Sequence, residues 1–406
     1  MLTIRRGAIA LSLAALLASS FAVSASADNS DQGFLPPSVE GINPHPGQLD
    51  GGQGGTNGGG SQGAGQGNQG EGGQNEHDGS GSSNGNPKGG ATALGYYGAS
   101  TISYHVGAPV MSNGINVYAI YYGNWEGAAT AAVANNSTGS IIGSGATAVP
   151  AYQSHSGNRD LINSFLSSIG GTSHFNINSG YYSQASATAA KVFIQNSVNF
   201  KASTTTFLVG TSKKTTLSDT DIKTVVSSAI SANTSFQVNG KPDPNGIYYV
   251  FTSAGISESS GFLSRYCGWH SAATINNVST KYSFVGDPSK SIATCAGQSA
   301  NSPHSSAGNN LVAGDAMVSV IVHELEETAT DPQLNAWYDT SGYENGDKCA
   351  WTFGTATSVT PAAGVGLNTT AYSYNYSTVL GGVTHNWLLQ QNWQITASPQ
   401  SCVISQ

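Results

Sequence analysis

Apolar side chains recur along the chain in two patterns, and together these predict alternating β-strands and helices. Residues 116–122 and 246–252 are nearly continuous runs of aliphatic and aromatic residues, which is typical of buried strands. Residues 159–169 and 217–230 instead have apolar positions three and four residues apart, as in amphipathic helices. Shorter strands are predicted at residues 191–194, 206–209, 269–275 and 281–285.

A third helix is expected to run from Asp315, whose side chain can cap it, to about residue 330. Its apolar positions are Met317, Val318, Ile321, Val322 and Leu325. The helix should end at Asp331, because the residue before Pro332 is disfavoured in the α conformation. Residues 351–406 are rich in Thr, Tyr and Gly and favour strands and loops. The predicted fold class is therefore α+β, with helices packed on a mixed β-sheet.

The first residues of the chain have the features of an export signal. Arg5 and Arg6 precede an apolar run over residues 8–23, which is shorter than a membrane-spanning helix. The small residues 25–27 then form a cleavage site for a signal peptidase. We expect residues 1–27 to be a signal peptide and the mature protein to be secreted and extracellular.

The next segment, residues 28–95, consists mainly of Gly, Asn, Gln and Ser. Between residues 47 and 88 it contains no Val, Ile, Phe, Tyr or Trp, so no apolar burial can offset the entropy cost of ordering it. A long disordered linker is predicted there. The α+β domain should then comprise residues 96–406.

Composition limits the classes of partner. Of the 406 residues only 9% are charged, and the 14 Lys and Arg against 22 Asp and Glu give a net charge of −8. A strongly basic nucleic-acid binder is excluded by this balance. No second apolar stretch is long enough to span a bilayer, so we expect no membrane contact after signal cleavage. The expected partners are an extracellular protein or a cell-wall polymer, and the oligomeric state is left open.

The four cysteines form an even set in a chain expected to be exported, which favours disulfides over free thiols. Three pairings are possible. Closure between nearest neighbours gives Cys267–Cys295 and Cys349–Cys402. Their spacing does not match a Cys-based zinc site, which requires close pairs of Cys.

The segment with the clearest chemistry is a His-Glu-x-x-Glu sequence inside the third helix. His323 and Glu327 are four residues apart, so an imidazole and a carboxylate share one helix face and can bind one ion. The pattern is that of His-Glu-x-x-His zinc helices with the second His replaced by Glu. Glu324 is then the candidate general base. Further metal ligands are expected among Asp331, Glu344 and Asp347.

Acidic residues are concentrated in this part of a chain that is otherwise poor in charge. Seven of the 22 acidic residues fall within 24 consecutive positions, namely Glu324, Glu326, Glu327, Asp331, Asp339, Glu344 and Asp347. Lys348 is the cation nearest to them in sequence, so a divalent metal would relieve the repulsion among the carboxylates. An imidazole ligand favours zinc, whereas a site made mainly of oxygen ligands would also suit calcium or manganese.

Two plainer interpretations stay open. The acidic positions can form a solvated helix face beside a surface loop, although the apolar run before His323 places this helix in a core, where unpaired carboxylates are costly. His270 follows the strongest strand and can face the metal helix, but a lone His is more commonly a core residue.

Short motifs along the chain resemble those of a known family. They are Tyr104-His105, Tyr121 to Trp125, Arg265 to His270, Gly314 to Val318, Ala329 to Pro332 and Trp387 to Leu389. In this order they resemble the phosphate-induced protein 1 family, whose plant members include EXORDIUM. The resemblance covers about residues 100–406 and implies a secreted cell-wall or extracellular protein.

The chain also departs from the plant pattern. Plant members of the family have apolar residues where His323 and Glu324 stand, and they lack the carboxylate of Glu327. The chain is therefore interpreted as a microbial-type member, and its order of strands and helix is similar to that of zincin metallopeptidases. This likeness implies a zincin-like mixed sheet.

Two functions follow from these observations. The first is a secreted protein with a divalent-metal site, zinc being favoured and calcium the alternative, acting as a candidate zinc-dependent peptidase with Glu324 as its base. The second is a non-catalytic extracellular or cell-wall binding module in which the acidic cluster holds a structural ion.

Overall fold

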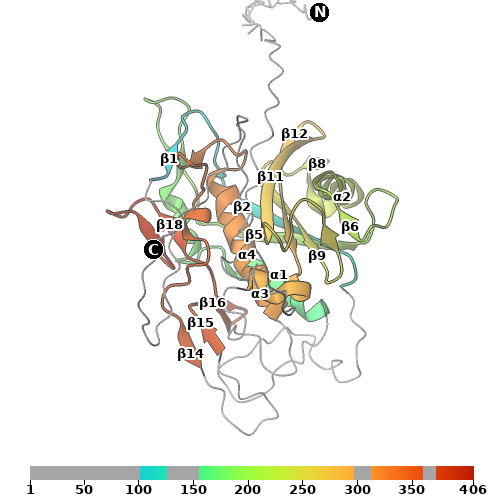
Figure 1. Cartoon of the computed structure of the whole chain (residues 1–406). Helices are drawn as coiled ribbons and strands as arrows, with labels where there is room; N and C mark the ends of the chain where they lie inside the picture. Colours follow the sequence, from blue (N-terminus) through green and yellow to red (C-terminus); the bar gives the residue numbers. More distant parts are fainter. Residues whose placement is uncertain (1–100, 126–154, 297–311, 360–371) are drawn as a thin grey trace, which may run out of the picture. The chain divides into compact units, whose positions relative to one another are not determined.

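The computed structural model describes residues 101–125, 155–296, 312–359 and 372–406, which are coloured in Figure 1. The signal peptide expected at residues 1–27 and the linker expected at residues 28–95 lie outside these ranges. Among the described helices, none combines the length and the hydropathy that a bilayer-crossing segment needs.

A five-stranded mixed sheet carries the described fold (Figure 1). In spatial order its strands are β11 (Gly268–Ile275), β12 (Val278–Gly286), β9 (Gly246–Thr252), β2 (Ile115–Tyr122) and β5 (Val198–Thr206). The last four run parallel to one another, and β11 pairs antiparallel with β12. The predicted α+β class with a mixed sheet is thereby confirmed.

Both faces of this sheet are covered by helices. Along β2 the side chains alternate, so that Val117 lies in one core cluster and Ile120 in the other. Helices α1 (His155–Ser168) and α4 (Val312–Thr330) contribute to the first cluster, whereas α2 (Asp219–Ala232) contributes to the second. Strands covered on both faces keep few polar positions, which explains their nearly continuous apolar runs.

Strand β5 departs most from the sequence expectation. Strands are predicted at residues 191–194 and 206–209, whereas β5 spans Val198–Thr206 and the first segment keeps only the two-residue β4 (Val192–Phe193). Strand β5 lies at one end of the sheet, and after the buried Val198 its side chains alternate between exposed and half-buried positions. Such a strand is built from Thr and other polar residues, so a search for apolar runs misses it.

Helix α4 is longer than expected and buried throughout. It begins at Val312, so Asp315 lies in its first turn instead of capping it. It ends at Thr330, immediately before Asp331 and Pro332, as predicted. Every residue from position 313 to the end of the helix is buried. Any ionisable side chain on this helix is consequently excluded from bulk water.

The remaining elements are short. Paired strands are β1 (Ser103–Tyr104) with β13 (Trp337–Tyr338), β3 (Tyr182–Ser183) with β4, β6 (Thr216–Leu217) with β10 (Ser257–Glu258), β7 (Gln237–Val238) with β8 (Lys241–Pro242), β14 (Thr357–Val359) with β15 (Tyr372–Tyr374), β16 (Tyr376–Leu380) with β17 (Val383–Trp387), and β18 (Asn392–Gln394) with β19 (Ser401–Val403). Short helical segments of one or two turns are η1 (Phe175–Gly180), η2 (Thr234–Phe236), η3 (Pro288–Ser291), α3 (Ile292–Cys295) and η5 (Asp347–Cys349).

Two disulfides join segments that are distant in sequence. Cys267, immediately before β11, bonds to Cys295 in α3, and Cys349 in η5 bonds to Cys402 in β19. The prediction of disulfides is confirmed, and the pairing is the nearest-neighbour one among the three possible. The second bond fixes η5, which begins at Asp347, to the C-terminal strands.

Removal of the Cys349–Cys402 bond should be strongly destabilising. The bond closes a sequence separation of 53 residues, for which the loss of chain entropy in the unfolded state corresponds to about 4 kcal/mol. Urea unfolding of the Cys349→Ser/Cys402→Ser double variant should show this loss. The Cys267→Ser/Cys295→Ser variant, which opens a separation of 28 residues, should lose slightly less. An unchanged urea midpoint in the first variant would contradict the expectation.

Candidate metal centre

The candidate site is built on α4, where helical spacing sets two ionisable side chains on the same face. His323 and Glu327 are separated by one helical turn, and Nε2 of His323 lies 3.0 Å from Oε1 of Glu327. Both side chains are completely buried. The convergence expected from their sequence spacing is therefore present in the structure.

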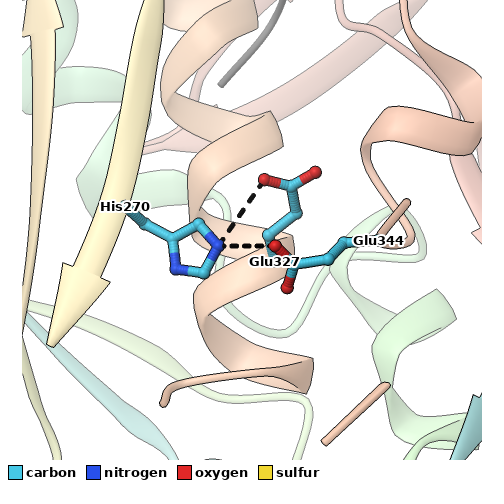
Figure 2. A group of neighbouring side chains, drawn as sticks. All are labelled: His270, Glu327 and Glu344. Carbon is cyan, nitrogen blue, oxygen red and sulfur yellow. Dashed lines mark hydrogen bonds and ion pairs between the residues drawn. The ribbon is translucent and has the colours of Figure 1, made fainter. Parts of the chain in front are cut away.

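The second element of the site is β11, which carries His270. Nε2 of His270 lies 2.9 Å from Oε2 of Glu344 and 3.8 Å from Oε2 of Glu327 (Figure 2). Figure 2 shows the imidazole directed toward both carboxylates, which come from α4 and from the loop that precedes η5. A strand, a helix and a loop thus meet at one point.

The third element is the segment 344–347, which folds back against α4. The backbone N–H of Asp347 donates to Oε1 of Glu327 at 3.0 Å, and the N–H of Glu344 donates to Oδ2 of Asp347 at 3.2 Å. Oδ1 of Asp347 lies 3.7 Å from Nε2 of His323. These contacts hold the acidic loop against the imidazole of the helix.

Five residues of these three elements fall into two groups with the geometry of a metal site. The first group is His270, Glu327 and Glu344, and the second is His323, Glu327 and Asp347. Within each group one ligand atom per residue lies within 4.8 Å of the others. All five residues are between 0% and 5% exposed. Imidazole nitrogens and carboxylate oxygens are the donor set that zinc and related divalent metals take in proteins.

Gln390 orients the imidazole of His323. Its amide Nε2 donates to the carbonyl of Gly346 at 2.9 Å and lies 2.8 Å from Nδ1 of His323, while its Oε1 accepts from the backbone N–H of Trp351 at 3.2 Å. With both amide atoms fixed, Nδ1 accepts a hydrogen bond and the neutral ring carries its proton on Nε2. Binding of an ion at Nε2 instead requires the other neutral tautomer, with the proton on Nδ1, and hence a rotated Gln390 amide whose oxygen accepts from the ring.

Burial controls the ionisation of the site. It lowers the pKa of both His270 and His323 to about 3, so the two rings are neutral at neutral pH. Burial also raises the pKa of Asp347 to about 7. The pKa of Glu324 is raised well above its usual range, first by burial and then by the charge of Asp347. Burial therefore favours the protonated forms of these two carboxyl groups, which reduces the negative charge of the cluster.

Glu324, the candidate base, lies next to the two groups without being a member of either. It is completely buried, and among the described residues neither of its carboxylate oxygens has a hydrogen-bond partner. A Cβ added to Gly268 would lie 3.1 Å from Oε1 of Glu324, so the carboxylate packs against the strand that carries His270. A buried carboxylate without donors is costly and is uncommon outside functional sites.

Asp331, an expected ligand, is not brought to either group. Its Oδ1 accepts the backbone N–H groups of Asn335 at 2.5 Å and of Ala336 at 2.7 Å. The reason is that α4 ends at Thr330, so the helical periodicity that would carry Asp331 to the face of His323 does not continue. Asp331 shapes the turn after the helix.

Two further acids of the cluster have cationic or imidazole partners elsewhere. Oε1 of Glu326 lies 3.0 Å from Nε2 of His174, and Oδ2 of Asp339 lies 2.7 Å from Nζ of Lys348. All four side chains are completely buried. Burial alone would lower the pKa of His174, but the charge of Glu326 outweighs it and raises that pKa.

His270 was a weaker candidate than the others, because it does not belong to a short sequence motif with metal-ligand spacing. Its position opposite α4 depends on the sheet, because β11 is the edge strand that lies next to β12. His270 also belongs to the Arg265-to-His270 motif, which offered a signal for a role beyond packing. His174 had no distinguishing context in the sequence at all.

Comparisons with known proteins bear on the chain as a whole. The model of one protein family, described as "Phosphate-induced protein 1 conserved region", matches residues 102–404. Protein EXORDIUM-like 3 of Arabidopsis thaliana is 26% identical over 326 residues, which cover 73% of this chain and 81% of that protein. Protein EXORDIUM-like 5 of Arabidopsis thaliana is 28% identical over 272 residues, 62% of this chain and 65% of that protein. No solved structure matches the chain, so the likeness to zincin peptidases stays a prediction.

Substitution of Gly346 should disturb the site directly. A Cβ at this position would lie 2.9 Å from Oε1 of Glu327 and 2.9 Å from Nδ1 of His323. We expect Gly346→Ala to cost about 1–3 kcal/mol, the range for overpacking a filled interior, measured by urea unfolding. Ser341→Ala, in an exposed part of the same loop, is the control and should change the stability little. Equal stability of the two variants would contradict the expectation.

Asp347 should make the metal-free protein less stable as the pH rises, relative to a variant without this carboxyl group. The pKa of Asp347 is raised from 3.8 to about 7 in the folded state, so folding disfavours its charged form. Its contribution is complete below about pH 4 and is lost as the pH rises through about 7, up to about 4 kcal/mol. The buried His270 and His323, whose pKa is lowered to about 3, act in the opposite direction and are present in both proteins. After chelation, the melting temperature of the wild type minus that of Asp347→Asn should therefore fall between pH 4.5 and 7.5, and a difference that stays constant or rises would refute the assignment.

Proposed function

The chain belongs to the phosphate-induced protein 1 family, and from that premise we propose that it is an exported extracellular protein built around a buried divalent-metal centre. The observation that carries the proposal is the convergence of two neutral imidazoles and three carboxylates in the core, where water cannot solvate them. Lys348, the cation nearest to the cluster in sequence, is already paired with Asp339. A bound metal supplies the positive charge that the cluster needs.

Zinc is the metal that we propose. The two groups provide one imidazole each, and imidazole ligands suit zinc better than calcium, which takes oxygen ligands. The carboxylates complete a mixed nitrogen and oxygen set of the kind found in zinc sites.

The proposed role of the metal is structural. The ligands come from β11, α4 and the loop before η5, so a bound ion would join three segments that are far apart in sequence. Their exposure of 5% or less fits an ion enclosed by protein, since a macromolecular substrate must reach an open coordination position. Under this proposal the protein is a binding module whose partner is an extracellular protein or a cell-wall polymer.

A second candidate function, metal-dependent peptide hydrolysis, is supported by Glu324. Its carboxylate lies beside the ligand groups, is buried, and has no hydrogen-bond partner among the described residues. A raised pKa suits a carboxylate that accepts and releases a proton. A divalent metal in such a site would supply Lewis-acid activation of a carbonyl group.

Extracellular placement is supported by two features. The predicted signal peptide occupies residues 1–27, and both disulfides of the described domain are of the kind that persists in oxidising surroundings. The plant relatives carry the EXORDIUM-like name and extend the comparison over most of the domain.

The proposal predicts that the exported full-length protein contains a divalent metal. Elemental analysis after dialysis should find zinc, and chelation should lower the melting temperature. Readdition of zinc at a hundred times its dissociation constant should restore about 2.7 kcal/mol of stability. A protein that contains no divalent metal and regains none would refute the proposal.

The same preparation separates the two functions. If the metal is structural, a peptide library stays uncleaved by both the wild type and Glu324→Gln. Cleavage by the wild type that falls at least a hundredfold in Glu324→Gln, with the metal retained, would instead establish the peptidase. Glu326→Gln is the matched control, because Glu326 is on the same helix but pairs with His174.

A further inference from the structure

The two ligand groups meet at a single side chain. Oε1 of Glu327 lies 3.0 Å from Nε2 of His323, whereas Oε2 lies 3.8 Å from Nε2 of His270. The two oxygens of one carboxylate therefore face two different imidazoles. We propose that Glu327 bridges two divalent ions, one held with His270 and Glu344 and the other with His323 and Asp347. This inference rests on the proposed metal-binding function and adds the number of ions and the bridging residue.

The distances suit one ion in each group. Ligand atoms that bind one ion at about 2.1 Å and at angles of 90–110° lie about 3.0–3.4 Å from each other. Around His270 the distances are 2.9 Å to Glu344 and 3.8 Å to Glu327. Around His323 they are 3.0 Å to Glu327 and 3.7 Å to Asp347. Both sets bracket the expected separation, so each group can hold one ion with Glu327 as the only ligand that they share.

The hydrogen-bond pattern supplies independent support. Nε2 of His323 is buried and directed at two carboxylates, yet it has no partner in hydrogen-bond geometry among the described residues. In the tautomer that carries the proton on Nδ1, this nitrogen has a free lone pair directed between the two carboxylates and can bind an ion together with them.

Bridged pairs of divalent ions held by carboxylates are an established arrangement in proteins. Here the two ions would share Glu327, and each would also be held by one imidazole and one further carboxylate.

The test is the metal stoichiometry of the exported, full-length protein. Titration of the chelated protein with zinc, read by elemental analysis after gel filtration, should reach two ions per chain. Glu344→Gln and Asp347→Asn should each retain one ion, and Glu327→Gln should retain less than either. Glu326→Gln is again the control and should retain two.

A spectroscopic measurement on the wild type avoids dependence on the folding of variants. The protein loaded with Mn²⁺ should give the electron paramagnetic resonance spectrum of an exchange-coupled pair. One ion per wild-type chain, or a spectrum of isolated Mn²⁺ at full loading, would overturn the bridge and leave the proposed function intact. A protein that binds no zinc and no Mn²⁺ would overturn both.

Discussion

The cost of placing carboxylates out of contact with water is the constraint on which the rest of this structure depends. Helix α4 lies in the core along its length and still carries three glutamates. Each buried charge must be compensated. Glu326 uses the imidazole of His174, whereas the acids around Glu327 face rings whose pKa burial has lowered to about 3. The same residue types thus form an ion pair on one face of the helix and the proposed ligand set on another.

The fold serves this cluster by fixing the three segments that meet there. The sheet buries β2 and β9 on both faces, so α4 packs against a filled layer and β11 presents His270 toward the helix. The loop before η5 is held by Asp347 N–H on Glu327 and by the disulfide of Cys349. Gly346 lets this loop approach, since any larger residue would contact Glu327 and His323. Side chains that are held rigidly in this way are well placed to bind an ion, because little ordering is needed on binding.

The sequence predicted those features of the fold and site that depend only on neighbouring residues. Helical spacing brought His323 and Glu327 together, and continuous apolar runs identified the strands buried on both faces. Asp331 was expected to be a ligand on the assumption that helical periodicity continues, but the chain leaves the helix at Thr330. His270 depends on strand order, and β5 on a position at the sheet's end, so neither could be read from neighbouring residues.

The need to compensate buried charges also limits how such a cluster can vary within a family. Removal of one ligand leaves the others as unpaired buried charges, which is strongly destabilising, whereas replacement of the whole cluster by apolar residues of similar volume is often neutral or stabilising. The apolar residues expected in plant members at His323 and Glu324, together with the expected loss of the Glu327 carboxylate, are a step toward the second kind of change. The sheet and its two cores contain none of the ligands except His270, so they can persist through that exchange. The match to the family extends over residues 102–404, whereas the proposed metal binding depends on the cluster as a unit.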